Sequence, residues 1–380
     1  MKYSIIVPVF NRPDEVRELL SSLTQQTHKD FEVIIVEDGS TNTCKDVCNQ
    51  FAGILDLYYY YKDNSGPGQS RNYGAERARG EWLIVLDSDV VLPPGYLAAV
   101  DERLKMKDER CDYSQNESSH TSQDKGSIEE GNHISHLSSF LSDIDAWGGP
   151  DTAHPDFTPV QKAISYSMTS FFTTGGIRGG KTKMDKFFPR SYNMGIRREV
   201  YRELGGFSKM RFGEDIDFSY RIVEAGYKTS LIPEAWVWHK RRTDFRKFFR
   251  QVYNSGIARI NLTKRHPGTL KLVHLLPTVF TLGVIGLILL SAVGRLLMYY
   301  VDNAQWRWLC LLPWVPILLY SLLIFVHSSI KNRSLWVGLL SVPAAFTQLM
   351  GYGFGFIEAW WKRCVLKKDE FQAFEKNFYK

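Results

Sequence analysis

Two uncharged apolar runs near the C-terminus place the strongest limit on how this 380-residue chain can fold. His274–Gly294 and Leu309–Val326 are each long enough to cross the hydrocarbon core of a membrane as a helix. A third run, Leu335–Trp361, is interrupted by Pro343, Gly351, Gly353 and Gly355 and carries Glu358, so spanning, re-entrant and interfacial arrangements all stay open for it. The sequence therefore predicts two transmembrane helices and a third apolar segment of open topology.

Before about Leu270, segments with strand-like and helix-like periodicity alternate. We expect buried strands at Tyr3–Val9, Phe31–Val36, Leu55–Tyr61 and Trp82–Leu86. Helices are expected between them, the third over Ser70–Ala78. This alternation predicts an α/β fold with a doubly wound, mostly parallel sheet. The carboxyl ends of such strands meet at one crevice, where ligands bind.

The last of these strands ends on Asp87-Ser88-Asp89. In extended chain, positions 87 and 89 face the same side, so both carboxylates can reach one hard cation. A solvated turn is the alternative, because Asp and Ser are common turn residues. The position at the expected crevice favours a site for a divalent metal and a diphosphate.

A second acidic group, Glu214-Asp215-Ile216-Asp217, opens a helix that ends at Gly226. The helix dipole favours ionised carboxylates in a first turn, and such a carboxylate can serve as a general base. Simple helix capping is the alternative.

His239 follows the expected strand Glu234–Trp238, where it is either a metal ligand or a structural residue. The loop Gly175–Lys181 suits an anion cradle and a plain hinge equally well.

Basic residues surround the apolar runs and account for the net charge of +6. Residues 240–265 precede the first run, and Lys331 and Arg333 lie between the second and third, in agreement with the positive-inside rule. Four more, at 362, 363, 367 and 368, follow the third run, which favours a segment that does not cross completely. Phe245–Ile257 has an apolar stripe opposite basic residues, as expected for a helix on the bilayer surface. We expect anionic lipid headgroups as the partner, and no nucleic acid.

Two further expectations concern processing and redox state. Tyr3–Val9 begins directly as a strand, so we expect no signal peptide and a cytosolic N-terminal domain. The five cysteines show no metal-binding spacing and are expected to be reduced.

The loop Gly66-Pro67-Gly68 lacks the third glycine of a dinucleotide fingerprint and follows the wrong strand, which excludes a Rossmann dehydrogenase.

An ordered set of motifs over roughly residues 1–260 resembles family 2 glycosyltransferases. The set comprises the first strand, Glu37-Asp38-Gly39-Ser40, Gly68-x-Ser70-Arg71-Asn72, Asp87-x-Asp89, Asn193-Met194-Gly195-x-Arg197-Arg198, Gly205-Gly206-Phe207 and Gly213-Glu214-Asp215-x-Asp217. The resemblance implies a GT-A fold, a nucleotide-sugar donor with a UDP-sugar favoured, Mn2+ or Mg2+ as cofactor, and inversion at the anomeric carbon.

The resemblance also implies roles for individual residues. Donor binding falls to Pro8, Glu37, Asp38, Arg71, Asp87 and Ser88. Asp89, Asp87 and His239 are the implied metal ligands. Asp215 is the implied catalytic base, with Glu214 as the second choice.

One departure from the family bears on processivity. The Q-x-x-R-W motif of processive synthases is missing, since Arg250-Gln251-Val252-Tyr253-Asn254 stands in the matching region. We therefore expect transfer of one sugar to a membrane-associated acceptor, either a polyprenyl-linked glycan or polyprenyl phosphate, in cell-surface polysaccharide or glycoconjugate synthesis. A processive synthase and a non-catalytic membrane scaffold are the alternatives.

These expectations divide the chain into four parts within a multi-pass protein of the cell membrane. They are a GT-A domain at 1–242 with a polar mobile insertion at 105–136, an interfacial helix and linker at 243–266, a transmembrane region at 267–361 and a basic tail at 362–380.

Overall fold

A computed structural model describes residues 1–105, 144–175, 187–300 and 311–371. The expected insertion at 105–136 and the loop at 175–181 lie outside these ranges except for their first residues, as does the end of the tail. The described residues fall into two compact units. The first is formed by Met1–Thr152 and Lys183–His239, and the second by Ala153–Thr182 and Lys240–Lys380. The second unit thus includes a segment that precedes the expected boundary at residue 242.

The first unit is built on a sheet of seven described strands in the order β3-β2-β1-β4-β8-β6-β9. These strands are β1 (Tyr3–Val9), β2 (Phe31–Asp38), β3 (Leu57–Lys62), β4 (Trp82–Leu86), β6 (Ala146–Gly148), β8 (Asn193–Arg197) and β9 (Thr229–Leu231). The first four are parallel, whereas β8 runs antiparallel to both β4 and β6. The prediction of an α/β fold with a mostly parallel sheet is therefore confirmed.

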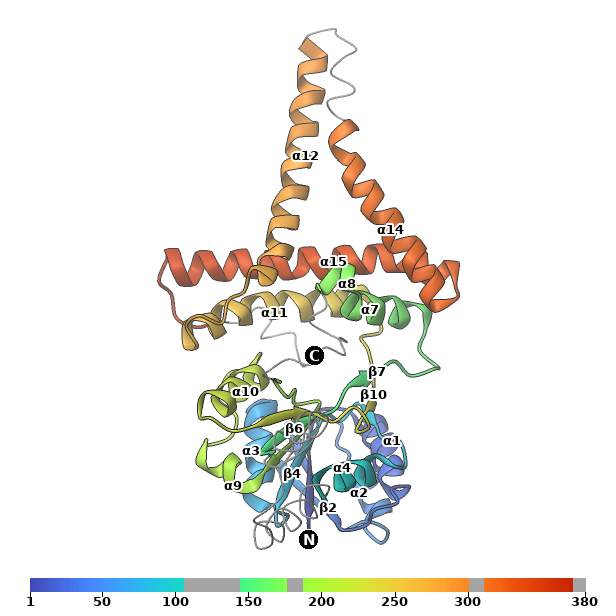
Figure 1. Cartoon of the computed structure of the whole chain (residues 1–380), viewed down its shortest axis with the longest axis vertical. Coiled ribbons are helices and arrows are strands. Elements are labelled where there is room, and N and C mark those ends of the chain that lie inside the picture. Colours follow the sequence, from blue (N-terminus) through green and yellow to red (C-terminus); the bar gives the residue numbers. More distant parts are fainter. Residues whose placement is uncertain (106–143, 176–186, 301–310, 372–380) are drawn as a thin grey trace, which may run out of the picture. The chain divides into compact units, whose positions relative to one another are not determined.

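Helices cover both faces of this sheet (Figure 1). They are α1 (Pro13–Thr24), α2 (Lys45–Phe51), α3 (Pro67–Arg77), α4 (Tyr96–Lys105), α9 (Arg198–Glu203) and α10 (Glu214–Glu224). Alternate residues of β1 serve different cores: Ile5 and Val7 pack with Leu19 of α1, whereas Ile6 packs with Ala75 of α3. Because every second side chain of a strand points to the opposite face, a continuous apolar strand is the expected consequence of burial on both sides.

A small sheet of three short strands adjoins the ends of the main one. It contains β5 (Val90–Val91), β10 (Val237–His239) and β7 (Asp151–Thr152), with β10 in the middle. The strand expected at Glu234–Trp238 is wrong in its position. Pro233 begins a turn in which the Ala235 N–H donates to the Ile232 carbonyl, so the strand starts two residues before His239.

One helix boundary also differs from the predictions. The helix expected at Ser70 begins at Pro67, because proline has no N–H to lose and its fixed φ suits a first helical position. From Pro159 to Phe172 apolar residues also recur at helical spacing in the sequence, but this segment does not form one helix. It divides at Ser170, which leaves helical geometry and accepts a hydrogen bond from the Phe172 N–H, giving α7 (Pro159–Thr169) and α8 (Phe171–Thr174).

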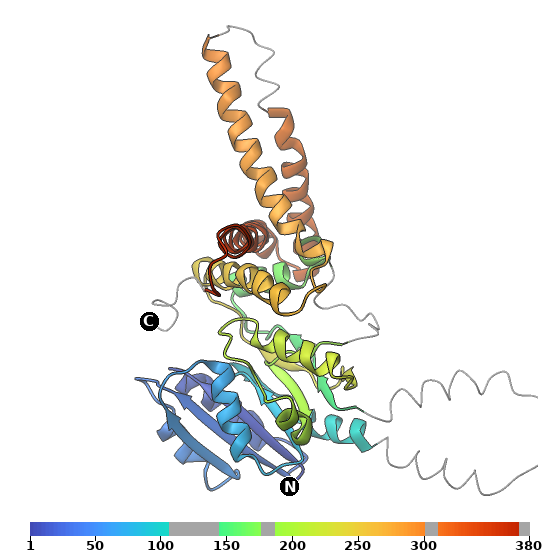
Figure 2. The ribbon, with the colours of Figure 1, turned by 90° about the vertical axis from the view of Figure 1, so that its left-hand side faces the viewer.

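The second unit is helical within its described residues. Besides α7 and α8 it contains α11 (Phe245–Arg265), α12 (Leu276–Tyr300), α14 (Val315–Asn332) and α15 (Leu335–Trp360). Among the described residues, three segments are long and apolar enough to cross a membrane: Leu272–Leu297, Leu312–Asn332 and Leu335–Val365. Figures 1 and 2 show α12 and α14 extending from α15 in a common direction, while α15 lies across their ends and alongside α11.

Candidate active site

The three predicted metal ligands come together in the first unit. Asp87 and Asp89 follow β4, and His239 is the last residue of β10. The antiparallel pairing of β10 with β5 places His239 opposite Val90, next to Asp89 in the chain. One ligand atom from each of the three side chains lies within 4.8 Å of the other two. The register of β10 against β5 therefore brings His239 next to the two aspartates that the D-x-D spacing already places together.

The imidazole of His239 is held on three sides. Its Nε2 lies 3.3 Å from Asp89 Oδ1, and its Nδ1 lies 3.7 Å from Asp151 Oδ2 on β7. The Tyr192 ring stacks on it with centroids 5.1 Å apart. A carboxylate beside the second ring nitrogen is the usual device for orienting a metal-binding histidine. Two carboxylates and one imidazole also suit Mn2+, so these residues fit the implied metal.

Guanidinium groups form ion pairs with both carboxylates of the candidate metal group. Arg71 Nη2 lies 2.8 Å from Asp87 Oδ1, and Arg12 pairs through Nη1 with Asp89 Oδ2. Arg71 comes from α3 and its side chain is buried, while Arg12 immediately precedes α1. Each oxygen of Asp89 thus faces a different partner, Arg12 or His239. A divalent cation at this position would compete directly with Arg12.

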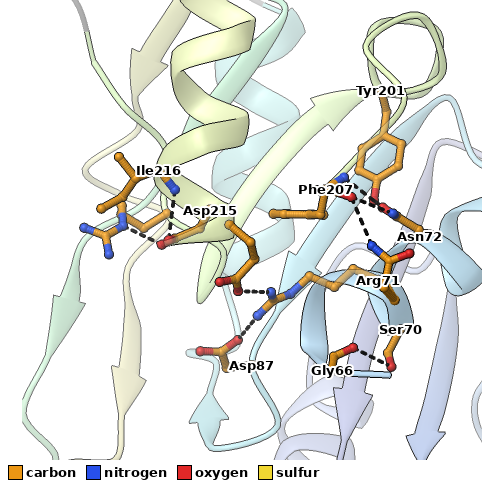
Figure 3. Close-up of polar contacts among 12 residues, drawn as sticks. Gly66, Ser70, Arg71, Asn72, Asp87, Tyr201, Phe207, Asp215 and Ile216 are labelled. Carbon is orange, nitrogen blue, oxygen red and sulfur yellow. Dashed lines mark hydrogen bonds and ion pairs between the residues drawn. The ribbon is translucent and has the colours of Figure 1, made fainter. Parts of the chain in front are cut away.

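Arg71 also connects the candidate metal group (Asp87, Asp89 and His239) to the second acidic cluster, which lies at the start of α10. Its Nη1 lies 2.8 Å from Glu214 Oε1, and its guanidinium lies 5.1 Å from the centre of the Phe207 ring. Figure 3 shows Arg71 between Asp87 and the start of α10, where Asp215 lies. A Cβ on Gly68 would approach Glu214 Cγ to 3.3 Å, so this glycine leaves room for the acid beside α3. The two acidic motifs are therefore parts of one connected site.

The two acids at the start of α10 differ in their electrostatics. Burial raises the pKa of Glu214 to about 7, against the opposing charge of Arg71. Burial would also raise the pKa of Asp215, but the Arg190 guanidinium, 2.6 Å away, outweighs it and lowers that pKa. The Ile216 N–H donates a further hydrogen bond to Asp215 Oδ1 at 2.9 Å. At neutral pH Asp215 is therefore the carboxylate that remains ionised.

Glu37 and Asp38, the residues at the end of β2 that were predicted to bind the sugar donor, accept hydrogen bonds from other residues of the chain. Glu37 is fully buried and accepts hydrogen bonds from the Ser40 and Tyr59 hydroxyls and from the Cys44 N–H. Asp38 accepts from the N–H groups of Ser65 and Gly66, each at 2.9 Å.

The Asp38 contacts fix the loop that opens α3. The described side-chain partners of Glu37 are Ser40, Cys44 and Tyr59, and none of them belongs to the group formed by Asp87, Asp89 and His239. Pro8 lies in β1 opposite Val36, and Ser88 is buried between the two aspartates. Donor contacts for these residues stay predictions.

Four residues of the site were missed by sequence reasoning: Arg12, Asp151, Arg190 and Tyr192. Each reaches its partner across a long sequence separation, as when Arg12 contacts Asp89 77 positions away. Arg12 lies in Asn11-Arg12-Pro13, directly after a predicted strand, and that position at the crevice was the one available signal. Asp151, Arg190 and Tyr192 lie outside any recognised motif.

Comparisons with known proteins agree with this geometry. The family model described as glycosyl transferase family 2 matches residues 4–205, just over half of the chain, and glycosyl transferase family group 2 matches residues 182–350. An uncharacterized glycosyltransferase of Rickettsia conorii is 33% identical over 132 residues, covering 35% of this chain and 21% of that protein. A poly(ribitol-phosphate) beta-glucosyltransferase of Bacillus spizizenii is 37% identical over 94 residues, covering 23% of this chain and 15% of that protein. The matches thus span less than a third of either relative's length.

The structural comparison extends over nearly the whole chain. A mannosyltransferase from Pyrobaculum calidifontis, solved with GDP-Man and Mn2+, gives a TM-score of 0.52 at 14% identity, covering 95% of this chain and 88% of that one. At this identity the likeness shows the fold, which is of the GT-A type. The family model matches most of the first unit, which is therefore the catalytic unit. By this match, the chain belongs to glycosyl transferase family 2.

Proposed function

We propose that this glycosyltransferase moves one sugar from a nucleotide-diphosphate sugar, a UDP-sugar in first place, to an acceptor held at a membrane, with inversion at the anomeric carbon. The observation that carries the proposal is the connection through Arg71 between Asp87 and Glu214. It unites a metal-type group of two carboxylates and an imidazole with a pair of acids of opposite pKa behaviour. This connection supports a donor site and a base site that adjoin each other at the carboxyl ends of the strands.

Asp87, Asp89 and His239 would hold the divalent ion, either Mn2+ or Mg2+. Such an ion, when bound, neutralises the negative charge that develops on a departing diphosphate. Arg12 lies beside Asp89, so its guanidinium is suited to contact the diphosphate once a metal replaces it there. Arg71 keeps Asp87 in place from the buried side.

With a glycan acceptor, Asp215 would accept the proton of the attacking hydroxyl. Its lowered pKa leaves it ionised, and Arg190 holds its carboxylate in position. The acceptor oxygen then bonds to the anomeric carbon while the bond from that carbon to the phosphate oxygen breaks and its electron pair leaves with the nucleotide. Attack on the face opposite the leaving group inverts the configuration. Glu214 stays the second choice for the base, because its raised pKa leaves it partly protonated at neutral pH.

The second unit supports an acceptor at the bilayer. Three described segments are apolar enough to span a membrane, and α11 presents exposed Arg246 and Lys247 beside them. We infer a multi-pass protein of the cell membrane with its catalytic unit in the cytoplasm, acting on a polyprenyl-linked glycan or polyprenyl phosphate. The Bacillus spizizenii relative, named for glucosylation of poly(ribitol phosphate), supports a role in cell-surface polymers.

The test is donor hydrolysis and transfer by membranes that contain the chain, with UDP-, GDP- and dTDP-sugars in the presence and absence of Mn2+. Asp89→Asn should abolish the Mn2+-dependent turnover of the preferred donor. Asp156→Asn is the matched control, because the Asp156 side chain is 88% exposed. Equal turnover in wild type and Asp89→Asn would contradict the proposal. The length of the radiolabelled product separates transfer of one sugar from processive synthesis, and a lack of any turnover would favour a scaffold.

A further inference from the structure

The apolar helix α15 packs along α11 with unusually close backbones. A Cβ on Gly256 of α11 would lie 2.2 Å from the Tyr352 carbonyl oxygen. On α15, a Cβ on Gly355 would lie 2.0 Å from the Tyr253 carbonyl oxygen, and one on Gly351 would lie 2.5 Å from Val252 Cγ2. Since glycine is the residue that permits such an approach, the two helices are fitted to each other over these turns. They run in the same direction, because later residues of one meet later residues of the other.

Polar contacts continue this pairing toward the C-terminal ends of both helices. Tyr253 donates a hydrogen bond to Glu358, which also pairs with Lys362. Beyond them, Lys264 Nζ donates to the Arg363 carbonyl at 2.5 Å, and Arg265 Nη2 lies 2.8 Å from Glu370 Oε2. The pairing therefore extends from the middle of α15 through the segment that follows it.

The charge distribution of α11 excludes a deep position in a membrane. Basic residues occur in its first turn (Arg246, Lys247), in its last turn (Lys264, Arg265) and between them (Arg250, Arg259). A helix with charges along its whole length lies in the headgroup region rather than across the hydrocarbon core. Because α15 is bound along α11, α15 must occupy nearly the same depth.

The candidate spans leave α15 in a different direction. A Cβ on Gly353 would lie 2.1 Å from Thr281 Oγ1, so the early turns of α12 pack closely on α15. From there α12 and α14 extend to one side, and α15 lies across their ends (Figures 1 and 2). Exposed tryptophans stand near both ends of α15, Trp336 at its start and Trp360 and Trp361 at its finish. Tryptophan favours the membrane–water interface, where its ring is apolar and its N–H is solvated.

The geometry points to α15 as a helix that lies on the lipid surface, so that within the described residues the chain crosses the bilayer twice, by α12 and α14. The residues after Trp361 then return to the side on which α11 lies. There Lys362, Arg363, Lys367 and Lys368 meet anionic lipid headgroups. This inference rests on the membrane anchoring proposed above and is independent of the transfer chemistry.

Two native cysteines can test the number of crossings. In the sequence Cys310 lies between the candidate spans Leu272–Leu297 and Leu312–Asn332, and Cys364 follows the apolar run Leu335–Trp361. Two crossings put them on opposite sides of the membrane, whereas three put them on the same side. The experiment uses Cys111→Ser chains that keep either Cys310 or Cys364, with Cys44 and Cys48 left in place because both are buried. Glu76→Cys, in a chain lacking Cys111, Cys310 and Cys364, marks the catalytic side, since the Glu76 side chain is 74% exposed.

Sealed vesicles in which Glu76→Cys is accessible are treated with a membrane-impermeant maleimide, before and after addition of detergent. We expect Cys364 to react in sealed vesicles to the same extent as Glu76→Cys, and Cys310 to react after detergent. Protection of Cys364 together with Cys310 would overturn the inference while leaving membrane anchoring intact. Recovery of the chain in the soluble fraction, with both cysteines always reactive, would overturn the anchoring as well. Retained Mn2+-dependent donor hydrolysis checks that each variant is folded.

Discussion

The pH dependence of turnover can identify the catalytic base, because the two acids at the start of α10 have pKa values moved in opposite directions. The pKa of Asp215 lies below its ordinary value of 3.8, and that of Glu214 is raised to about 7. A general base must be ionised to accept a proton, so kcat/KM falls as the pH drops below the pKa of the base. The two assignments therefore predict different acid limbs.

The size of the difference follows from the ionised fractions. At pH 5 an acid with a pKa below 3.8 remains more than about 90% ionised, so with Asp215 as base kcat/KM should be nearly flat from pH 8 to pH 5. An acid with a pKa of about 7 is roughly 1% ionised at pH 5. With Glu214 as base, kcat/KM would fall about 100-fold over that range.

The assay is the initial rate of transfer at low donor concentration and saturating Mn2+, for the wild type, Asp215→Asn and Glu214→Gln. We expect a flat wild-type profile, an inactive Asp215→Asn and a Glu214→Gln that keeps the wild-type profile. A histidine must be neutral to bind a metal, so a limb caused by a histidine ligand would persist in Glu214→Gln. A tenfold loss per pH unit below 7 that disappears in Glu214→Gln would refute Asp215 as the base.

Three other predictions concern single contacts. Arg12→Gln removes the cation that pairs with Asp89, so titration with Mn2+ alone should show tighter binding, by a factor of about 10 or more, while UDP binding weakens; unchanged affinity for both would exclude this competition. Gly149→Ala places a Cβ 1.7 Å from the Ala235 carbonyl oxygen and should lower the free energy of unfolding of the catalytic unit by roughly 3 kcal/mol in a thermal melt, whereas Gly95→Ala, with open space around its Cβ, should be neutral. Gly355→Leu should separate α15 from α11, and increased trypsin cleavage near Lys362 would report it; an unchanged digestion pattern would count against the close pairing.

Local pattern was sufficient to predict the part of the fold that depends on burial. The runs Tyr3–Val9 and Trp82–Leu86 are nearly continuous in apolar residues because helices cover both faces of the sheet, and both strands form as expected. Asp87 and Asp89 could be predicted as a pair because two residues separated by one share a face of an extended chain. Their meeting with His239 needed the resemblance to a family as well, since His239 lies 150 positions after Asp89.

The remaining parts depend on tertiary contacts that local pattern does not encode. The antiparallel direction of β8 is set by its neighbours β4 and β6, and its sequence resembles that of any short buried strand. Arg190 reaches Asp215 from an irregular segment, and Asp151 reaches His239 through the pairing of β7 with β10. Arg71 was expected at the base or diphosphate of the donor, and its ion pairs with Asp87 and Glu214 show a further task in joining the two acidic groups.

We propose that Asp87, Asp89 and His239 hold a divalent metal together with the donor diphosphate. The most direct test of this proposal is the loss of the free Mn2+ signal in electron paramagnetic resonance when detergent-solubilised protein is titrated in the presence of UDP. The wild type and the surface control Asp156→Asn should bind one equivalent of Mn2+, and Asp89→Asn and His239→Ala should bind far more weakly. Binding of Mn2+ by both site variants with wild-type affinity would contradict the account.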